Sequence, residues 1–164
     1  SMIEGGVHAL FPFGTNGEGY ILNAKEKQLV LETVIDQCNG RVPVYAGTGC
    51  ISTKETIEQS RMAQAAGADV LSIITPSFAA ASQEELYVHY KTIAEAVDMP
   101  IVLYNIPART GNALAPATVA VWLRSITLWA LRIPVETLPI SWAISMRGRR
   151  RKTENFTLCQ EMTS

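Results

Sequence analysis

The residue types best suited to chemistry fall in two short segments, each directly after an apolar run. The first is the loop at residues 14–18, Gly-Thr-Asn-Gly-Glu, whose glycines allow a tight turn with exposed backbone N–H groups. Thr15 and Asn16 add side-chain donors, so the loop could hold a carboxylate. The alternative is a plain turn whose glycines supply positive φ angles. The glycine spacing is not the G-x-G-x-x-G pattern of dinucleotide binding.

The second segment spans residues 103–111, Leu-Tyr-Asn-Ile-Pro-Ala-Arg-Thr-Gly. It places Tyr104 at a predicted strand end and Arg109 on a loop stiffened by Pro107. A phenol that handles protons beside a guanidinium that binds an anion is one interpretation. The other is a core tyrosine followed by a solvated arginine, and this segment alone does not separate the two.

Four short apolar runs must position these residues, and they have the composition of strands covered on both faces. The predicted strands are Val7–Phe13, Val42–Gly47, Asp69–Thr75 and Pro100–Tyr104. They alternate with helical segments, an order typical of a parallel sheet, either open and doubly wound or closed as a (βα)8 barrel. Polar residues follow each run, and barrels build their sites at the carboxyl ends of many strands. We therefore predict an α/β fold, a partial (βα)8 TIM barrel with four βα units.

The helices have clear start signals. Three times, a capping side chain precedes a glutamate by three residues, the spacing of the capping box. The pairs are Asn23 with Glu26, Ser52 with Glu55, and Ser82 with Glu85. Asn39-Gly40 and Gly67 then supply stop signals for the first two helices.

Composition excludes several classes of function. The 164 residues are 48% apolar and 18% charged with a net charge of -1, so no overall basic balance predicts nucleic-acid binding, and no apolar run is long enough to span a membrane. The three cysteines form no zinc motif with the two histidines, and reduced thiols in a cytoplasmic protein are expected. No metal or cofactor is predicted. The regular pattern ends near residue 121, and all three tryptophans and a basic run at 147–152 follow that point.

Together the two polar segments resemble the dihydrodipicolinate synthase / N-acetylneuraminate lyase family, class I aldolases that bind pyruvate as a Schiff base on a (βα)8 barrel. Residues 42–49 (Val-Pro-Val-Tyr-Ala-Gly-Thr-Gly), 65–69 (Ala-Ala-Gly-Ala-Asp) and Thr75-Pro76 are also similar to that family. The resemblance covers residues 3 to about 120 and identifies the four units with family strands 2–5.

The resemblance implies a role for each matching residue. Thr15, Asn16 and Gly17 would bind the carboxylate of pyruvate or another 2-oxo acid, and Thr15 and Tyr104 would relay protons. Arg109 would bind the carboxylate of the second substrate. Asn16 stands where a threonine is usual, which is reminiscent of members acting on 2-keto-3-deoxy sugar acids or 4-hydroxy-2-oxoglutarate.

Ser77-Phe78 replaces the tyrosine pair of the synthases, so one relay hydroxyl is absent. The synthase and sugar-acid aldolase interpretations therefore both stay open. A non-enzymatic interaction fragment is the third.

The family's Schiff-base lysine has no counterpart among the chain's lysines, which are Lys25, Lys27, Lys54, Lys91 and Lys152. The first four lie on or beside predicted helices and the last in the basic run. A Schiff-base lysine instead needs a desolvated position inside the barrel. We therefore predict that this chain is inactive, and that half a barrel forms a homo-oligomer or aggregates.

A one-base frame slip near Val121 accounts for the tail. When codons are read across residue junctions, Ile126/Thr127 to Thr137/Leu138 permit N-I-V-G-I-K-D-S-S-G-N-F, with the glycine at Trp129/Ala130 forced. Junctions Leu158/Cys159 to Met162/Thr163 permit L-S-G-N-D. These strings resemble the sixth- and seventh-strand motifs of the family. We therefore divide the chain into a partial barrel domain (1–123) and an aberrant, out-of-frame tail (124–164), with a divergent but genuine C-terminus as the alternative.

Overall fold

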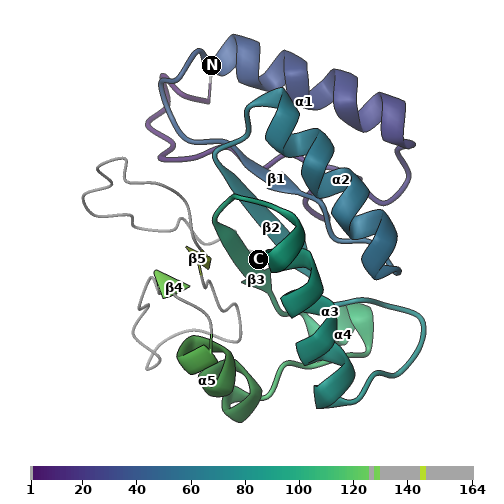
Figure 1. Ribbon diagram of the computed structural model, residues 1–164. Helices are drawn as coiled ribbons and strands as arrows, with labels where there is room; N and C mark the ends of the chain where they lie inside the picture. The colour runs from purple at the N-terminus through teal and green to yellow at the C-terminus, as the bar shows by residue number, and fades with distance from the viewer. Residues whose placement is uncertain (1, 126–127, 130–144, 147–164) are drawn as a thin grey trace.

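The computed structural model describes residues 2–125, 128–129 and 145–146 (Figure 1). Its elements are, in chain order, α1 (Ala24–Cys38), β1 (Tyr45–Gly47), α2 (Thr53–Ala66), β2 (Val70–Ile74), α3 (Gln83–Ala96), β3 (Ile101–Tyr104), α4 (Pro107–Thr110), α5 (Pro116–Ser125), β4 (Leu128–Trp129) and β5 (Ser145–Met146). Strands and helices alternate from α1 to β3, as the apolar runs predict.

The three strands β1, β2 and β3 form one parallel sheet in that order. Figure 1 shows α1, α2 and α3 on the same side of this sheet. Sequential parallel strands joined by helices are the βα units of a barrel or a doubly wound sheet. The structure therefore confirms three of the predicted strands; β2 and β3 are slightly shorter than their apolar runs, and β1 spans only the second half of its run.

The predicted strand Val7–Phe13 pairs with β1 only over a short stretch. Tyr45 N donates to Leu10 O (2.8 Å), and Gly47 N donates to Pro12 O (3.2 Å). The regular ladder ends there because Pro12 has no N–H to donate back, and Phe13 has φ 69°. What the sequence predicted as a full strand is therefore one parallel bridge, Leu10 to Val44, followed directly by a turn at Pro12 and Phe13.

The predicted helix starts are confirmed. Both halves of the capping box form at Asn23 and at Ser82, whereas Ser52 makes the half in which its hydroxyl accepts from the Glu55 N–H. The predicted stops are also found, because Asn39 and Gly67 adopt the left-handed conformation at the C-terminal ends of α1 and α2.

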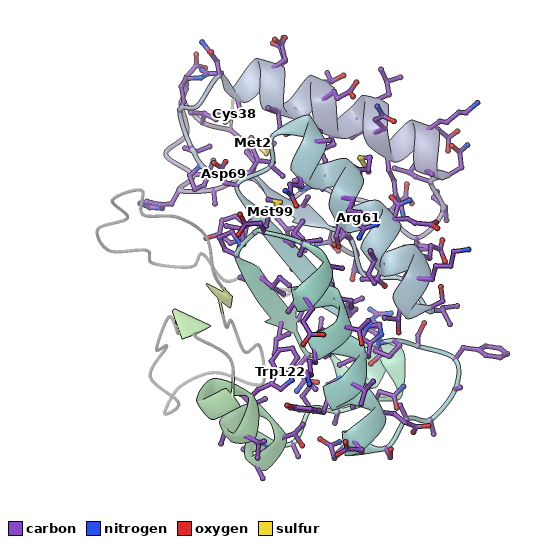
Figure 2. The ribbon with its side chains drawn as sticks, in the orientation of Figure 1. Met2, Cys38, Arg61, Asp69, Met99 and Trp122 are labelled. Atoms are coloured by element: carbon purple, nitrogen blue, oxygen red, sulfur yellow. The ribbon has the colours of Figure 1, made fainter. Side chains whose placement is uncertain are left out.

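The core lies between the sheet and the helices. Alternate strand residues face the helices and are at most 1% exposed; they are Ala46, Leu71, Ile73, Ile101 and Leu103. Trp122 of α5 is also buried and packs its ring edge against Tyr90 of α3, with 5.3 Å between ring centroids (Figure 2). Helix α5 is thereby docked on α3.

The predicted domain boundary after residue 123 falls within the last turn of α5. The predicted tail lies mostly outside the described residues, as do Cys159 and Lys152. Among the residues that are described, no helix is long and apolar enough to cross a bilayer.

Candidate functional site

The loop after the Leu10 segment is a compact turn whose backbone is strained. Gly17 N donates to Gly14 O (3.0 Å) and Glu18 N donates to Thr15 O (3.2 Å), so these two N–H groups close the turn. Phe13 and Glu18 flank it with φ 69° and 49°. Such left-handed conformations cost roughly 1–3 kcal/mol each in non-glycine residues and concentrate at functional sites.

The close approach of the loop to its own base requires a glycine at position 19. A Cβ there would lie 2.6 Å from Phe13 Cβ and 2.6 Å from Phe13 O. Thr15, Asn16 and Gly17 lie at the exposed tip of the turn. The structure thus presents all three predicted carboxylate-binding residues on one surface loop.

Tyr104 closes β3 with a half-buried side chain. Its ring meets Phe11 edge-on, with 6.0 Å between centroids and an interplanar angle of 83°. Phe11 precedes the turn by only a few residues, so this contact joins the segment that carries Thr15 to the strand that carries Tyr104. The contact places the residue just before the first candidate segment beside Tyr104 of the second, although the two segments lie about 90 residues apart in sequence.

The same contact is typical of a curved sheet. Two strands, β1 and β2, separate the Leu10 segment from β3, and neighbouring strands lie about 4.8 Å apart. A flat sheet of that width would hold Phe11 and Tyr104 roughly 14 Å apart at the backbone. Side chains that stand upright on a sheet meet across that width when their face is concave, so we infer that the face opposite the helices curves inward, as the inside of a barrel does.

Arg109 lies in α4, a single turn that begins at Pro107, ends at Thr110 and is followed by Gly111 with φ 76°. Its side chain is exposed. Proline at the first helical position and glycine after the last fix both ends of this turn. The backbone of α4 therefore fixes the position from which the Arg109 side chain extends, next to the end of β3.

Asn112, which no sequence pattern singled out, is buried and organises this end of the sheet. Its Nδ2 donates to Pro76 O and to Ala79 O, and its Oδ1 accepts from Ala81 N, all at 2.8 Å. The side chain is 4% exposed. One amide thus holds three backbone groups of the loop 76–81. The only signal in the sequence is a polar residue between Gly111 and an apolar run.

Two threonines connect Asn112 to the strands. Thr75, fully buried at the end of β2, lies 2.7 Å from the Thr110 hydroxyl and donates to Asn112 O (3.1 Å). Asn105 Oδ1 accepts from Leu114 N (3.1 Å) and closes the next loop. The predicted gathering of polar side chains at strand ends is therefore present, although Thr75, Thr110 and Asn105 are tied to the protein and serve to fix its loops.

Four lysines lie within the described residues, all on helices: Lys25 and Lys27 on α1, Lys54 on α2 and Lys91 on α3. Lys54 and Lys91 each lie 3.9 Å from a glutamate one helical turn away. The side chains of Lys54 and Lys91 are 87% and 46% exposed, on the outer surface of their helices.

The half-buried thiol of Cys50 is unsuited to nucleophilic chemistry. Burial raises the pKa of Cys50 to about 11, and the negative charge of Glu55 adds to the effect. The thiol is therefore protonated at neutral pH, whereas the thiolate is the reactive form. Among the residues described, no cluster of His, Cys, Asp and Glu side chains could hold a metal ion.

Comparison with known proteins gives a consistent result. The model of the dihydrodipicolinate synthetase family matches residues 1–138. The 4-hydroxy-tetrahydrodipicolinate synthase of Methanopyrus kandleri is 47% identical over 119 residues, covering 73% of this chain and 40% of that protein. Its counterpart from Pelobacter propionicus is 52% identical over 118 residues, covering 72% and 41%.

The solved structures that resemble this chain belong to the same family. Chloride-inhibited dihydrodipicolinate synthase from Acinetobacter baumannii, complexed with pyruvate, is 44% identical with a TM-score of 0.73, covering 76% of this chain and 42% of that one. A prophage protein of the same family from E. coli K12, also in complex with pyruvate, is 40% identical with a TM-score of 0.72 and the same coverage. The chain thus spans about two fifths of the length of the relatives it matches.

Proposed function

The chain belongs to the dihydrodipicolinate synthetase family, and from that premise we propose that residues up to about 123 are part of a pyruvate-dependent carbon–carbon lyase or synthase. The observation that carries the proposal is the contact between Phe11 and Tyr104 on the concave face of the sheet. It supports a site at the carboxyl ends of the strands, where a parallel barrel holds its active site, because Phe11 directly precedes the first polar segment and Tyr104 ends β3. Two relatives of similar fold were solved with pyruvate bound, which supports pyruvate as substrate.

Each site residue has a role in this proposal. Thr15 and Asn16 hold the carboxylate of pyruvate or another 2-oxo acid at the exposed tip of the loop, and Gly17 shapes that tip, because its N–H donates to Gly14 O. Tyr104 moves protons while a lysine amine condenses with the keto carbon and water leaves. Arg109 binds the carboxylate of the second substrate by charge and hydrogen bonding.

We further propose that the 164-residue chain does not catalyse this reaction by itself. The four described lysines support this, because each lies on a helix and none lies at the end of a strand. A frame slip near Val121 explains why the lysine motif is absent from the translated sequence, since the Leu131/Arg132 junction permits a lysine codon in the shifted frame. Residues 124–164 are then not selected as protein.

The identity of the second substrate has two candidates. Arg109 favours a synthase whose second substrate carries a carboxylate, and the relatives named 4-hydroxy-tetrahydrodipicolinate synthase support this. Asn16, in place of threonine, and Phe78, in place of tyrosine, favour a 2-keto-3-deoxy sugar acid or 4-hydroxy-2-oxoglutarate type of aldolase. A role as a non-enzymatic interaction fragment is the further alternative if the chain is expressed as it stands.

Borohydride trapping tests the chemistry, because it reduces an imine between lysine and pyruvate to a stable adduct. The 164-residue chain should give no adduct by mass spectrometry. A version with the frame restored near Val121, extended by the βα units of a full-length relative, should gain one adduct on the lysine across Leu131/Arg132. An adduct on the unaltered chain would refute its inactivity, and no adduct on the restored protein would refute the proposed reaction.

A matched pair of tyrosine variants in the restored protein tests the role of the phenol. Tyr104→Phe should slow adduct formation by about 10²-fold or more, the usual contribution of a positioned proton carrier. Tyr20→Phe is the control, because Tyr20 is 75% exposed and lies outside the proposed site. Equal rates for the two variants would remove Tyr104 from the mechanism.

A further inference from the structure

Gln83, the first residue of α3, holds the part of the chain that follows α4. Its Nε2 donates to Ala113 O (2.8 Å), and its Oε1 accepts from Ala115 N (2.9 Å) and from the Thr118 hydroxyl (2.7 Å). Ala115 directly precedes α5, and Thr118 lies in the first turn of that helix. One exposed amide therefore anchors the start of α5 to the start of α3.

Asn112 makes the reverse connection. Its amide binds the backbone of the loop 76–81, which leads into α3. Each of the two segments thus contributes one amide that binds the other segment. We call this pair of side chains, Gln83 and Asn112, the amide clamp. It joins residues 76–83 to residues 112–118, and because each half holds the segment that carries the other half, neither segment can move alone.

Arg109 lies on a turn that cannot be stable by itself. Helix α4 has four residues, and its Arg109 and Thr110 N–H groups both donate to Ile106 O, at 2.9 and 3.1 Å. A single helical turn fixes more backbone torsions than its hydrogen bonds repay, so isolated turns of this length do not persist. The conformation of α4 must therefore come from tertiary contacts.

Three buried polar side chains supply such contacts, and all of them lead to the clamp. The Thr110 hydroxyl lies 2.7 Å from the Thr75 hydroxyl just after β2, and it accepts from Asn112 N (3.3 Å). Ahead of the turn, Asn105 Oδ1 accepts from Leu114 N (3.1 Å), within the stretch that the clamp holds. These hydroxyls and amides are at most 7% exposed, so water does not compete for them. Both ends of α4 are thereby fixed to the clamped segments.

We propose that Gln83 and Asn112 are positioning residues for Arg109, and that the amide clamp holds the guanidinium where the carboxylate of the second substrate binds. This role rests on the proposed function of Arg109. An exposed arginine side chain has many rotamers, so the backbone of α4 is what fixes its origin. A shift of that origin by about 1 Å is enough to misplace a carboxylate contact. The clamp acts on the substrate only through this turn.

Amide hydrogen exchange on the unaltered chain tests the clamp. In Gln83→Ala, the Thr110 N–H should exchange at least about tenfold faster, although that N–H donates within its own turn. Gln28→Ala is the matched control and should leave this rate unchanged, because Gln28 is an exposed glutamine whose amide donates to Glu32 within α1. If Gln83→Ala accelerated the Ala115 N–H but not the Thr110 N–H, Gln83 would serve α5 alone and the inference would be overturned.

A double-mutant cycle in the restored protein tests positioning. The probe is succinate semialdehyde, an aldehyde that carries a carboxylate, and the other reactant is pyruvate. Gln83→Ala should raise the KM for the aldehyde about tenfold and leave the rate of pyruvate adduct formation unchanged. Gln83→Glu keeps the oxygen that accepts from Ala115 and Thr118, so it should restore most of the KM. In an Arg109→Ala background, Gln83→Ala should add nothing further. Equal effects of Gln83→Ala in the two backgrounds would refute positioning.

The two experiments separate the clamp from the reaction that it serves. An unchanged Thr110 exchange rate in Gln83→Ala, together with a normal pyruvate adduct in the restored protein, would overturn the role of the clamp and leave the reaction standing. The absence of an adduct in the restored protein would refute the reaction, whatever the exchange rates are.

Discussion

Replacing Asn112 with alanine should destabilise the fold through one loop. The Asn112 amide makes three hydrogen bonds of 2.8 Å to the backbone of the loop 76–81, at Pro76, Ala79 and Ala81. Alanine fills less space and makes none of them. Two carbonyls and one N–H then lose their partner. Among the residues described, Asn112 is the only residue of α4 or of the turn after it whose side chain is hydrogen-bonded to this loop.

The size of the effect follows from burial. Leaving a buried polar group without a partner costs about 1–3 kcal/mol. Asn112 itself is 4% exposed, but the loop backbone lies nearer the surface and Ala79 is exposed, so water can replace part of what is lost. We therefore expect a loss of roughly 2–4 kcal/mol for the three groups together, a large share of the roughly 5–15 kcal/mol that stabilises a typical domain.

Urea unfolding followed by circular dichroism, at one fixed protomer concentration, measures this loss. Asn39→Gly is the matched control: Asn39 is exposed and left-handed at the end of α1, a conformation that glycine adopts freely, so the change should stay within a few tenths of a kcal/mol. Asn112→Asp should also destabilise, because it removes both donors and buries a charge. If Asn112→Ala behaved like Asn39→Gly, the loop would not depend on the amide.

Two further predictions concern α3. Burial lowers the pKa of His89 to about 4, so between about pH 4 and 6.5 the unfolded chain binds more protons than the folded chain. Stability should hold above pH 6.5 and decline as the pH falls through this window, and His89→Gln should flatten the decline in urea titrations; an unchanged profile would contradict the assignment. Ser82→Ala should cost about 1 kcal/mol by removing the hydroxyl that accepts from Glu85 N, whereas Ser82→Thr, which keeps an acceptor, should cost less. Equal midpoints for the two Ser82 variants would argue against the cap.

Local sequence determined most of the repeating unit. A capping side chain and its glutamate meet within one helical turn, so Asn23 and Ser82 form their boxes whatever the rest of the chain does. The apolar runs that became β1, β2 and β3 are buried in any parallel sheet, and the family motifs around Thr15 and Tyr104 identified the family that the comparisons confirmed.

Tertiary structure decided what depends on contacts between distant residues. Phe11 and Tyr104 meet only because the sheet curves, and the sequence contains no local signal for curvature. Asn112 is buried only because the loop 76–81 folds over it, and a lone asparagine after a glycine predicts an exposed turn equally well. The Leu10 segment ended after one bridge because Pro12 faces β1, and which way a proline nitrogen points is set by register, a property of the paired strands together.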